Sequence, residues 1–148
     1  MKAKVIEDAD DVTYVAVCDP GDEAFGALTQ FARDQDLEAS QITAVGAFSR
    51  ATVGWFDPVS RQYRRIPVDE QCEVLSLIGD VAEGPDGPSV HVHVVLGLSD
   101  GTTRGGHLLE GKVRPTLEVV LTDSPAHLRR KKSADIGIAL IDLGVGKR

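Results

Sequence analysis

EVLSLIGDVAEGPDGPSVHVHVVLGL, residues Glu73–Leu98, contains the clearest strand and turn signals in the chain. Glu73–Gly79 and Ser89–Leu98 are rich in the β-branched and apolar residues that favour strands. Between them, Gly84–Pro88 reads Gly-Pro-Asp-Gly-Pro, a strong turn signal. The stretch therefore predicts two strands on either side of a tight turn, as in an antiparallel sheet.

The rest of the chain adds one helix and several more strands. Glu23–Asp36 is predicted to be an amphipathic helix with Asp22 as its N-cap, because apolar residues recur there at helical spacing. Pro67 places one short strand at a sheet edge, and Ser49-Arg50 is expected to join two others tightly. The pattern predicts an α+β fold, mainly antiparallel β-sheet with one principal helix. The further strands are expected at Val12–Cys18, Ile42–Phe48, Ala51–Phe56, Gln62–Ile66, Thr116–Thr122 and Ile136–Leu143.

Length and composition indicate a single globular domain over residues 1–148. No apolar run approaches the roughly 20 residues that span a bilayer. No apolar segment follows the N-terminal lysines, so we expect no signal peptide and no membrane partner, and a cytoplasmic location. Cys18 and Cys72 lie far apart with no CxxC spacing, which favours buried free thiols over a disulfide.

The charge balance argues against nucleic acid as a partner. The chain has 16 Lys and Arg against 23 Asp and Glu, a net charge of −7, whereas DNA binding depends on neutralising phosphates with basic side chains. The densest basic run, His127–Lys132, is interpreted as a solvated loop.

Three of the four histidines are placed as metal ligands would be. His91 and His93 are two residues apart in a predicted strand, so both side chains leave the same face. His107 follows after 13 residues that include a turn signal, which is enough chain to return it beside the pair. Gly105-Gly106 just before it fits a bulge or a close backbone approach. The alternative is that these are ordinary structural histidines.

Three converging imidazoles match the protein ligands of an open zinc site. Zinc is the default divalent metal for such a set, and iron, manganese, nickel and copper stay open. Glu73 and Glu118 each lie within an apolar strand, so either could hydrogen-bond to a ligand histidine or take an acid/base role, and Glu73 is the leading candidate. The metal could activate water or polarise a carbonyl group of a small-molecule ligand.

The order of several motifs resembles the plant-and-prokaryote-conserved (PPC) domain family from about Val12 to Leu143. The matching segments are Gly21-Asp22-Glu23, Ile42-Thr43-Ala44-Val45-Gly46-Ala47, Glu73–Gly79, Val90-His91-Val92-His93, Gly105-Gly106-His107-Leu108 and Glu118-Val119. The resemblance implies a homotrimer with the histidines near a subunit boundary. It also implies a fold similar to that of acetolactate decarboxylase, whose zinc is bound by an H-x-H pair and a later histidine.

Three functions stay open from the sequence. The leading hypothesis is a homotrimer with a metal site at His91, His93 and His107, acting on a small carbonyl or carboxylate compound if it is an enzyme. The second is a DNA-binding or chromatin-associated protein, because plant family members bind DNA; they usually carry an Arg-Gly-Arg-Pro AT-hook, whereas the nearest string here is Val113-Arg114-Pro115. The third is a non-catalytic trimeric scaffold.

Overall fold

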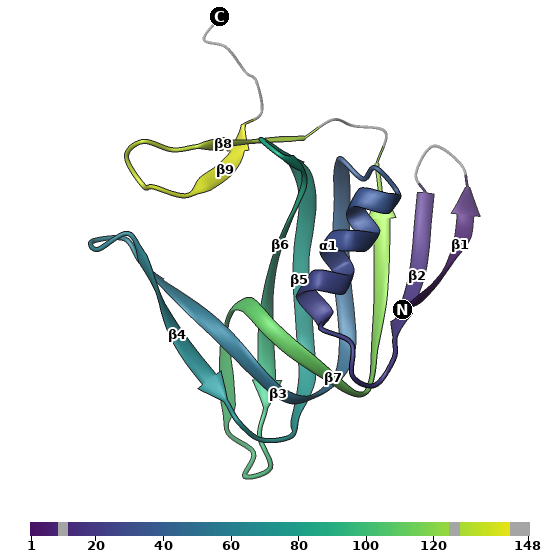
Figure 1. Cartoon of the computed structure of the whole chain (residues 1–148), viewed down its shortest axis with the longest axis vertical. Coiled ribbons are helices and arrows are strands. Elements are labelled where there is room, and N and C mark those ends of the chain that lie inside the picture. Colours follow the sequence, from purple (N-terminus) through teal and green to yellow (C-terminus); the bar gives the residue numbers. More distant parts are fainter. Residues whose placement is uncertain (9–11, 125–127, 143–148) are drawn as a thin grey trace, which may run out of the picture.

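The computed structural model describes residues 1–8, 12–124 and 128–142 of the 148. These residues form mostly antiparallel β-sheet with a single helix packed against one face of it (Figure 1). The predicted fold class is confirmed. The elements are β1 (Lys2–Asp8), β2 (Val12–Cys18), α1 (Ala24–Asp34), β3 (Ala39–Asp57), β4 (Gln62–Val68), β5 (Cys72–Gly84), β6 (Gly87–Gly97), β7 (Thr103–Asp123), β8 (Arg129–Lys132) and β9 (Ala139–Asp142).

Four long strands form the centre of the molecule. β3 pairs with β5 and β7, and β6 pairs with β5 and β7, so the four strands close a circuit of antiparallel ladders. β2 extends the sheet beyond β7, and β1 pairs with β2. The core lies between α1 and this sheet and includes the fully buried Leu28, Phe48 and Leu121. The long strands therefore provide the rigid frame from which the histidines project.

The sequence misplaced one turn. Ile42–Phe48 and Ala51–Phe56 were expected to be separate strands, but they are one strand, β3, which bends near Ser49. The backbone continues because β7 stays paired with it beyond the bend, as at Arg50 opposite Lys112. Register irregularities at Phe48 absorb the bend, so a turn is not needed.

The C-terminal part also differs from expectation. The basic run was interpreted as a solvated loop, but Arg129–Lys132 forms β8, which pairs with β9; His127 lies outside the described residues. The strand predicted at Ile136–Leu143 is confined to Ala139–Asp142, and Leu143 is likewise outside the described part. β1 was not predicted at all. β4 covers the expected Gln62–Ile66, continues through Pro67 to Val68, and among the described residues pairs with β3.

The helix begins one residue later than predicted. Glu23, and not Asp22, is the N-cap, and its carboxylate accepts hydrogen bonds from the backbone N–H groups of Phe25 (3.2 Å) and Gly26 (2.7 Å). It also accepts one from the N–H of Gly111 (3.0 Å). The longer side chain of Glu23 therefore caps the helix and attaches it to β7, which the shorter Asp22 side chain could not do from its position.

Cys18 and Cys72 are both buried free thiols, as predicted. In the described part of the chain, no helix has the length and apolar character of a membrane span.

Candidate metal centre

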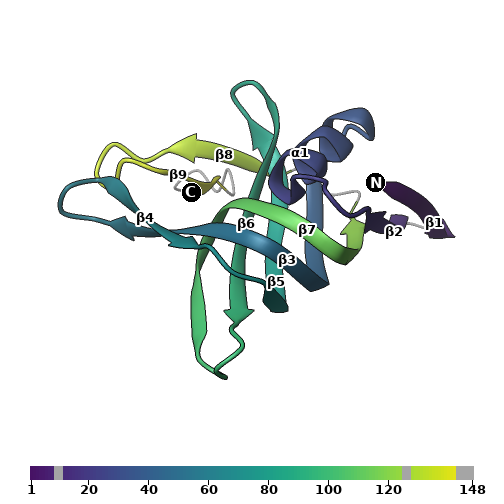
Figure 2. The same cartoon turned by 60° about the horizontal axis from the view of Figure 1, so that its bottom comes forward.

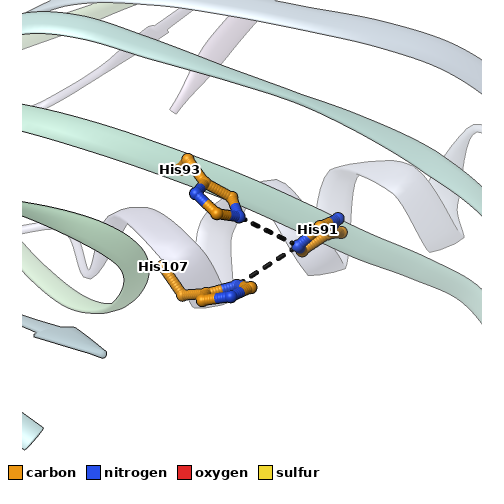
Figure 3. A group of neighbouring side chains, drawn as sticks. All are labelled: His91, His93 and His107. Atoms are coloured by element: carbon orange, nitrogen blue, oxygen red, sulfur yellow. Dashed lines mark hydrogen bonds between the residues drawn. The ribbon is translucent and has the colours of Figure 1, made fainter. Parts of the chain in front are cut away.

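The three predicted histidines lie together on one side of the sheet. His91 and His93 project from the same face of β6, and β7 returns so that His107 is the register partner of His93. Figure 3 shows the three rings turned toward one another from these two strands. The hairpin between β6 and β7 thus brings the third ring beside the pair, as the 13-residue spacing predicted.

Glycines allow the strands that bear these histidines to approach closely. A Cβ on Gly106 would lie 2.5 Å from the carbonyl oxygen of Gly54, and the residue has a φ of +155°. A Cβ on Gly79 would lie 2.1 Å from the carbonyl oxygen of His91. Any side chain at either position would push the neighbouring strand away. The predicted close backbone approach before His107 is present, and it fixes where that ring stands.

The ring nitrogens have the spacing of ligands around one small cation. Nε2 of His91 lies 3.2 Å from Nδ1 of His107 and 3.3 Å from Nε2 of His93, and one nitrogen from each ring falls within 4.8 Å of the others. Nitrogens about 2.0–2.1 Å from a tetrahedral zinc ion would be about 3.3 Å apart. Two edges of the triangle therefore match a zinc site.

A chain of hydrogen bonds explains this arrangement less well. A neutral imidazole nitrogen carries either one proton or one lone pair, so it serves one partner well. Nε2 of His91 faces both neighbouring rings at nearly the same distance. Three nitrogens directed at a common point are the donor set that a divalent metal prefers, and the residues present fit such an ion.

Burial keeps two of the imidazoles in the neutral form that binds metal. The pKa of His107 is lowered to about 4, chiefly by desolvation on burial and further by the neighbouring His93 and His91. Burial also lowers the pKa of His91, with a smaller contribution from the positive charge of Arg130. Both rings are therefore uncharged near neutral pH, with lone pairs available to a cation.

One carboxylate stands behind the cluster. Oδ2 of Asp80 is 3.9 Å from Nδ1 of His91, the ring nitrogen that faces away from the other histidines. The other Asp80 oxygen pairs with Nη2 of Arg130. Asp80 is thus placed to favour a proton on Nδ1 of His91 and leave Nε2 free for a metal, the usual task of a carboxylate beside a ligating histidine.

The structure places Glu73 elsewhere. Its register partner is Gly97, four residues along β6 from His93, a separation of about 13 Å at 3.3 Å per residue. The side chain is exposed. The role assigned to Glu73 stays a prediction, and within one chain Asp80 is the carboxylate that lies beside the histidines.

Sequence reasoning missed Asp80, although the turn signal contained the information. The turn between β5 and β6 has two residues, Pro85 and Asp86, with Gly84 opposite Gly87. Counting back equally from this turn puts Asp80 opposite His91, as the structure does. Arg130 could not be found this way, because its burial depends on the C-terminal hairpin.

A cleft of about 680 Å³ adjoins the histidines. Tyr63 of β4 forms part of its wall and packs edge-on against His107, with ring centroids 4.9 Å apart. Asp80 and Arg130 contribute its charged groups, and Ile138–Ile141 contribute apolar surface. The volume lies within the usual range for a small-molecule site.

Curated relatives match most of the chain. The Bifunctional protein GlmU of Synechococcus sp. (strain JA-3-3Ab) is 35% identical over 130 residues, which is 86% of this chain and 20% of that protein. The corresponding protein of strain JA-2-3B'a(2-13) is 34% identical over 128 residues, 85% of this chain and 19% of that protein. The chain therefore spans about one fifth of the length of these relatives.

Solved structures share the whole fold. A plant- and prokaryote-conserved (PPC) protein of Pyrococcus horikoshii has a TM-score of 0.83 and 29% identity, covering 95% of this chain and 94% of that one. A metal-containing protein of Archaeoglobus fulgidus has a TM-score of 0.81 and 28% identity, covering 95% and 96%. A "Putative DNA-binding protein" of Ralstonia eutropha has a TM-score of 0.81 and 27% identity, covering 88% and 90%.

A more distant structure shares the fold alone. It is a Staphylococcus aureus protein described as similar to alpha-acetolactate decarboxylase, with a TM-score of 0.53 and 14% identity over 78% of this chain and 53% of that one. The family model of the Plants and Prokaryotes Conserved (PCC) domain, the PPC domain of the sequence analysis, matches residues 7–125. With this match and the shared fold, the chain belongs to the Plants and Prokaryotes Conserved domain family.

Proposed function

We propose that this protein binds one divalent metal ion, with zinc as the expected ion, through His91, His93 and His107. The observation that carries the proposal is the convergence of three ring nitrogens at 3.2 and 3.3 Å separations. The description of the Archaeoglobus fulgidus relative as metal-containing supports it. Zinc bound by three protein ligands keeps a position for water or a substrate oxygen.

The adjoining cleft suits metal-assisted chemistry on a small carbonyl or carboxylate compound. The bound metal would polarise a carbonyl group or lower the pKa of water. The protein contributes the rest: Asp80 orients His91, Tyr63 supports the ring of His107, and the apolar residues of β9 give the cleft an apolar wall. Such chemistry would make the domain an enzyme.

The experiment that tests the metal site is elemental analysis of protein purified without a histidine tag. We expect about one metal equivalent per chain, retained through extensive dialysis. Protein that stays metal-free after incubation with excess zinc, although folded by circular dichroism, would contradict the proposal.

Asp80→Asn should weaken zinc binding by roughly 10- to 100-fold, the usual cost of losing a carboxylate beside a ligand histidine. The amide keeps the shape of the side chain and removes the charge near Nδ1 of His91. Competition with a chromophoric chelator measures the affinity. Asp86→Asn, in the exposed turn of the same hairpin, makes the same chemical change away from the site and should have no effect. Equal affinities for the two variants would rule out the role given to Asp80.

We also propose that the domain is a homotrimer. We place it in the cytoplasm, because both cysteines are free thiols and disulfides are rare in that compartment. The face of the sheet that bears His93 also exposes apolar side chains, including Val45 (56% exposed), Ile78 (57%) and Val95 (43%). The helix α1 covers the opposite face. Neighbouring subunits would bury these side chains. Light scattering should give three times the 15.8-kDa chain mass, and a monomer at micromolar concentration would contradict this.

DNA binding is the second candidate function. The description of the Ralstonia eutropha relative favours it, and Arg129, Lys131 and Lys132 are exposed on β8. The net charge of −7 opposes it. Titration with duplex DNA at several salt concentrations distinguishes the two functions, because phosphate contacts weaken steeply as salt rises. No binding at low salt would exclude this candidate.

A further inference from the structure

Arg130 is the most unusual charged residue of the described chain. Its side chain is only 5% exposed, and it lines the same cleft as the three histidines. Nη2 pairs with Asp80, and Nη1 makes only a long contact of 3.5 Å with the carbonyl oxygen of Ala139. Nε has no partner, and among the described residues it is the one buried side-chain polar atom in that state.

A buried guanidinium with an unused donor is costly to maintain. Leaving a buried polar group without a hydrogen bond costs about 1–3 kcal/mol, and more for a charged group. The guanidinium of arginine has five N–H donors on three nitrogens, and Asp80 pairs with only one of these nitrogens, Nη2. Because Nε is itself buried, Nη1, whose contact with Ala139 is long, is the nitrogen left to an anionic partner in the cleft that Arg130 lines.

A contact between two hairpins holds Arg130 in this position. The side chain of Arg61, in the turn between β3 and β4, donates to the carbonyl oxygens of Ala134 (3.2 Å) and Asp135 (2.8 Å), in the turn between β8 and β9. Figure 2 shows these two hairpins projecting on the same side of the sheet. These two hydrogen bonds hold the β8–β9 hairpin, which bears Arg130, against the turn between β3 and β4. Arg130 and the histidines therefore line the walls of one cleft.

The charges of the cleft select among anions. One guanidinium beside a metal attracts a negative group, and the planar fork of arginine suits a carboxylate. The carboxylate of Asp80, which also lines the cleft, would repel the two charges of a phosphate dianion more strongly than the single charge of a carboxylate. Leu140 and Ile141 provide apolar surface for a short carbon chain.

We propose that Arg130 binds the carboxylate of a small organic acid in this cleft, beside the metal site on which the proposal rests. The ligand class is a short monocarboxylate with a second oxygen next to the carboxylate, which a metal ion held by the three histidines would coordinate. Arg130 is thus a specificity-determining residue, and its pairing with Asp80 through Nη2 leaves Nη1 to the ligand.

Pyruvate is the probe, titrated calorimetrically into protein loaded with zinc, whose metal content is measured beforehand. Arg130→Gln should weaken pyruvate binding roughly 10- to 100-fold, as expected for hydrogen bonds to a charged group. Arg129→Gln is the matched control, because Arg129 pairs with Glu83 at 2.7 Å and is 68% exposed. Methyl pyruvate and inorganic phosphate should both bind more weakly than pyruvate.

Asp80→Asn separates a ligand-binding role of Arg130 from a merely structural one. At a zinc concentration that saturates both proteins, which offsets the weaker zinc binding of this variant, the substitution releases the guanidinium from its ion pair. Pyruvate binding should then stay as strong or become stronger, whereas a structural pair predicts the same loss from either substitution. Unchanged pyruvate affinity in Arg130→Gln, or equal binding of methyl pyruvate, would overturn the proposal. Absence of a zinc equivalent in the wild type would overturn the metal site instead, and comparing pyruvate binding of wild type and Arg130→Gln would still decide the role of Arg130.

Discussion

His91→Ala should abolish stoichiometric metal binding. Its Nε2 is the nitrogen that lies within 3.3 Å of both other rings, so its loss leaves two ligands of three. The affinity for zinc should fall by more than the roughly 10- to 100-fold that a supporting residue costs. Elemental analysis after dialysis, together with chelator competition, measures the loss.

Ser89→Ala is the control for this substitution. Ser89 lies two residues before His91 on β6 and lines the same cleft, but it is not one of the three proposed ligands. This variant should keep its full metal equivalent. Retention of one equivalent by His91→Ala would show that the metal binds elsewhere.

Phe48→Ala should lower the free energy of unfolding by about 3–5 kcal/mol, the usual cost of removing a fully buried aromatic ring. Phe48 is completely buried, and it lies at the bend of β3, where the ladder with β7 is irregular. Because domains are stable by only about 5–15 kcal/mol, this change should consume a large part of the stability. Urea denaturation of metal-free protein at one chain concentration measures it.

Phe56→Ala, on the same strand, makes the same chemical change at a half-buried site whose ring contacts Tyr63. It should cost clearly less than Phe48→Ala. Equal losses from the two substitutions would mean that the bend of β3 is not held by the core.

Most strands could be predicted because their apolar patterns and turn residues agree locally. The turn Gly84–Pro88 and the strands on either side of it are the clearest case. Ser49-Arg50 was misinterpreted because local sequence does not reveal that β7 continues the ladder on the far side. The strand β8 was missed for the same reason, since its polar residues are ordered by pairing with β9 and by the contact of Arg130 with Asp80.

The candidate site, like the fold, could be predicted only where the residues lie close together in the sequence. His91, His93 and His107 were found because strand periodicity and a turn signal place them together. Asp80 could have been found by counting register from the two-residue turn. Arg130 could not, because its burial results from a hairpin that is distant in sequence from the histidines. Sequence pattern thus predicts what one hairpin brings together, and the structure adds what other elements place around it.

Anomalous scattering measured at the zinc absorption edge, on crystals of untagged protein, tests the metal site most directly. The predicted result is one strong peak about 2.0–2.1 Å from Nε2 of His91, Nε2 of His93 and Nδ1 of His107. Crystals grown with zinc that show no anomalous peak at these nitrogens, with the rings hydrogen-bonded to one another or to water, would contradict it.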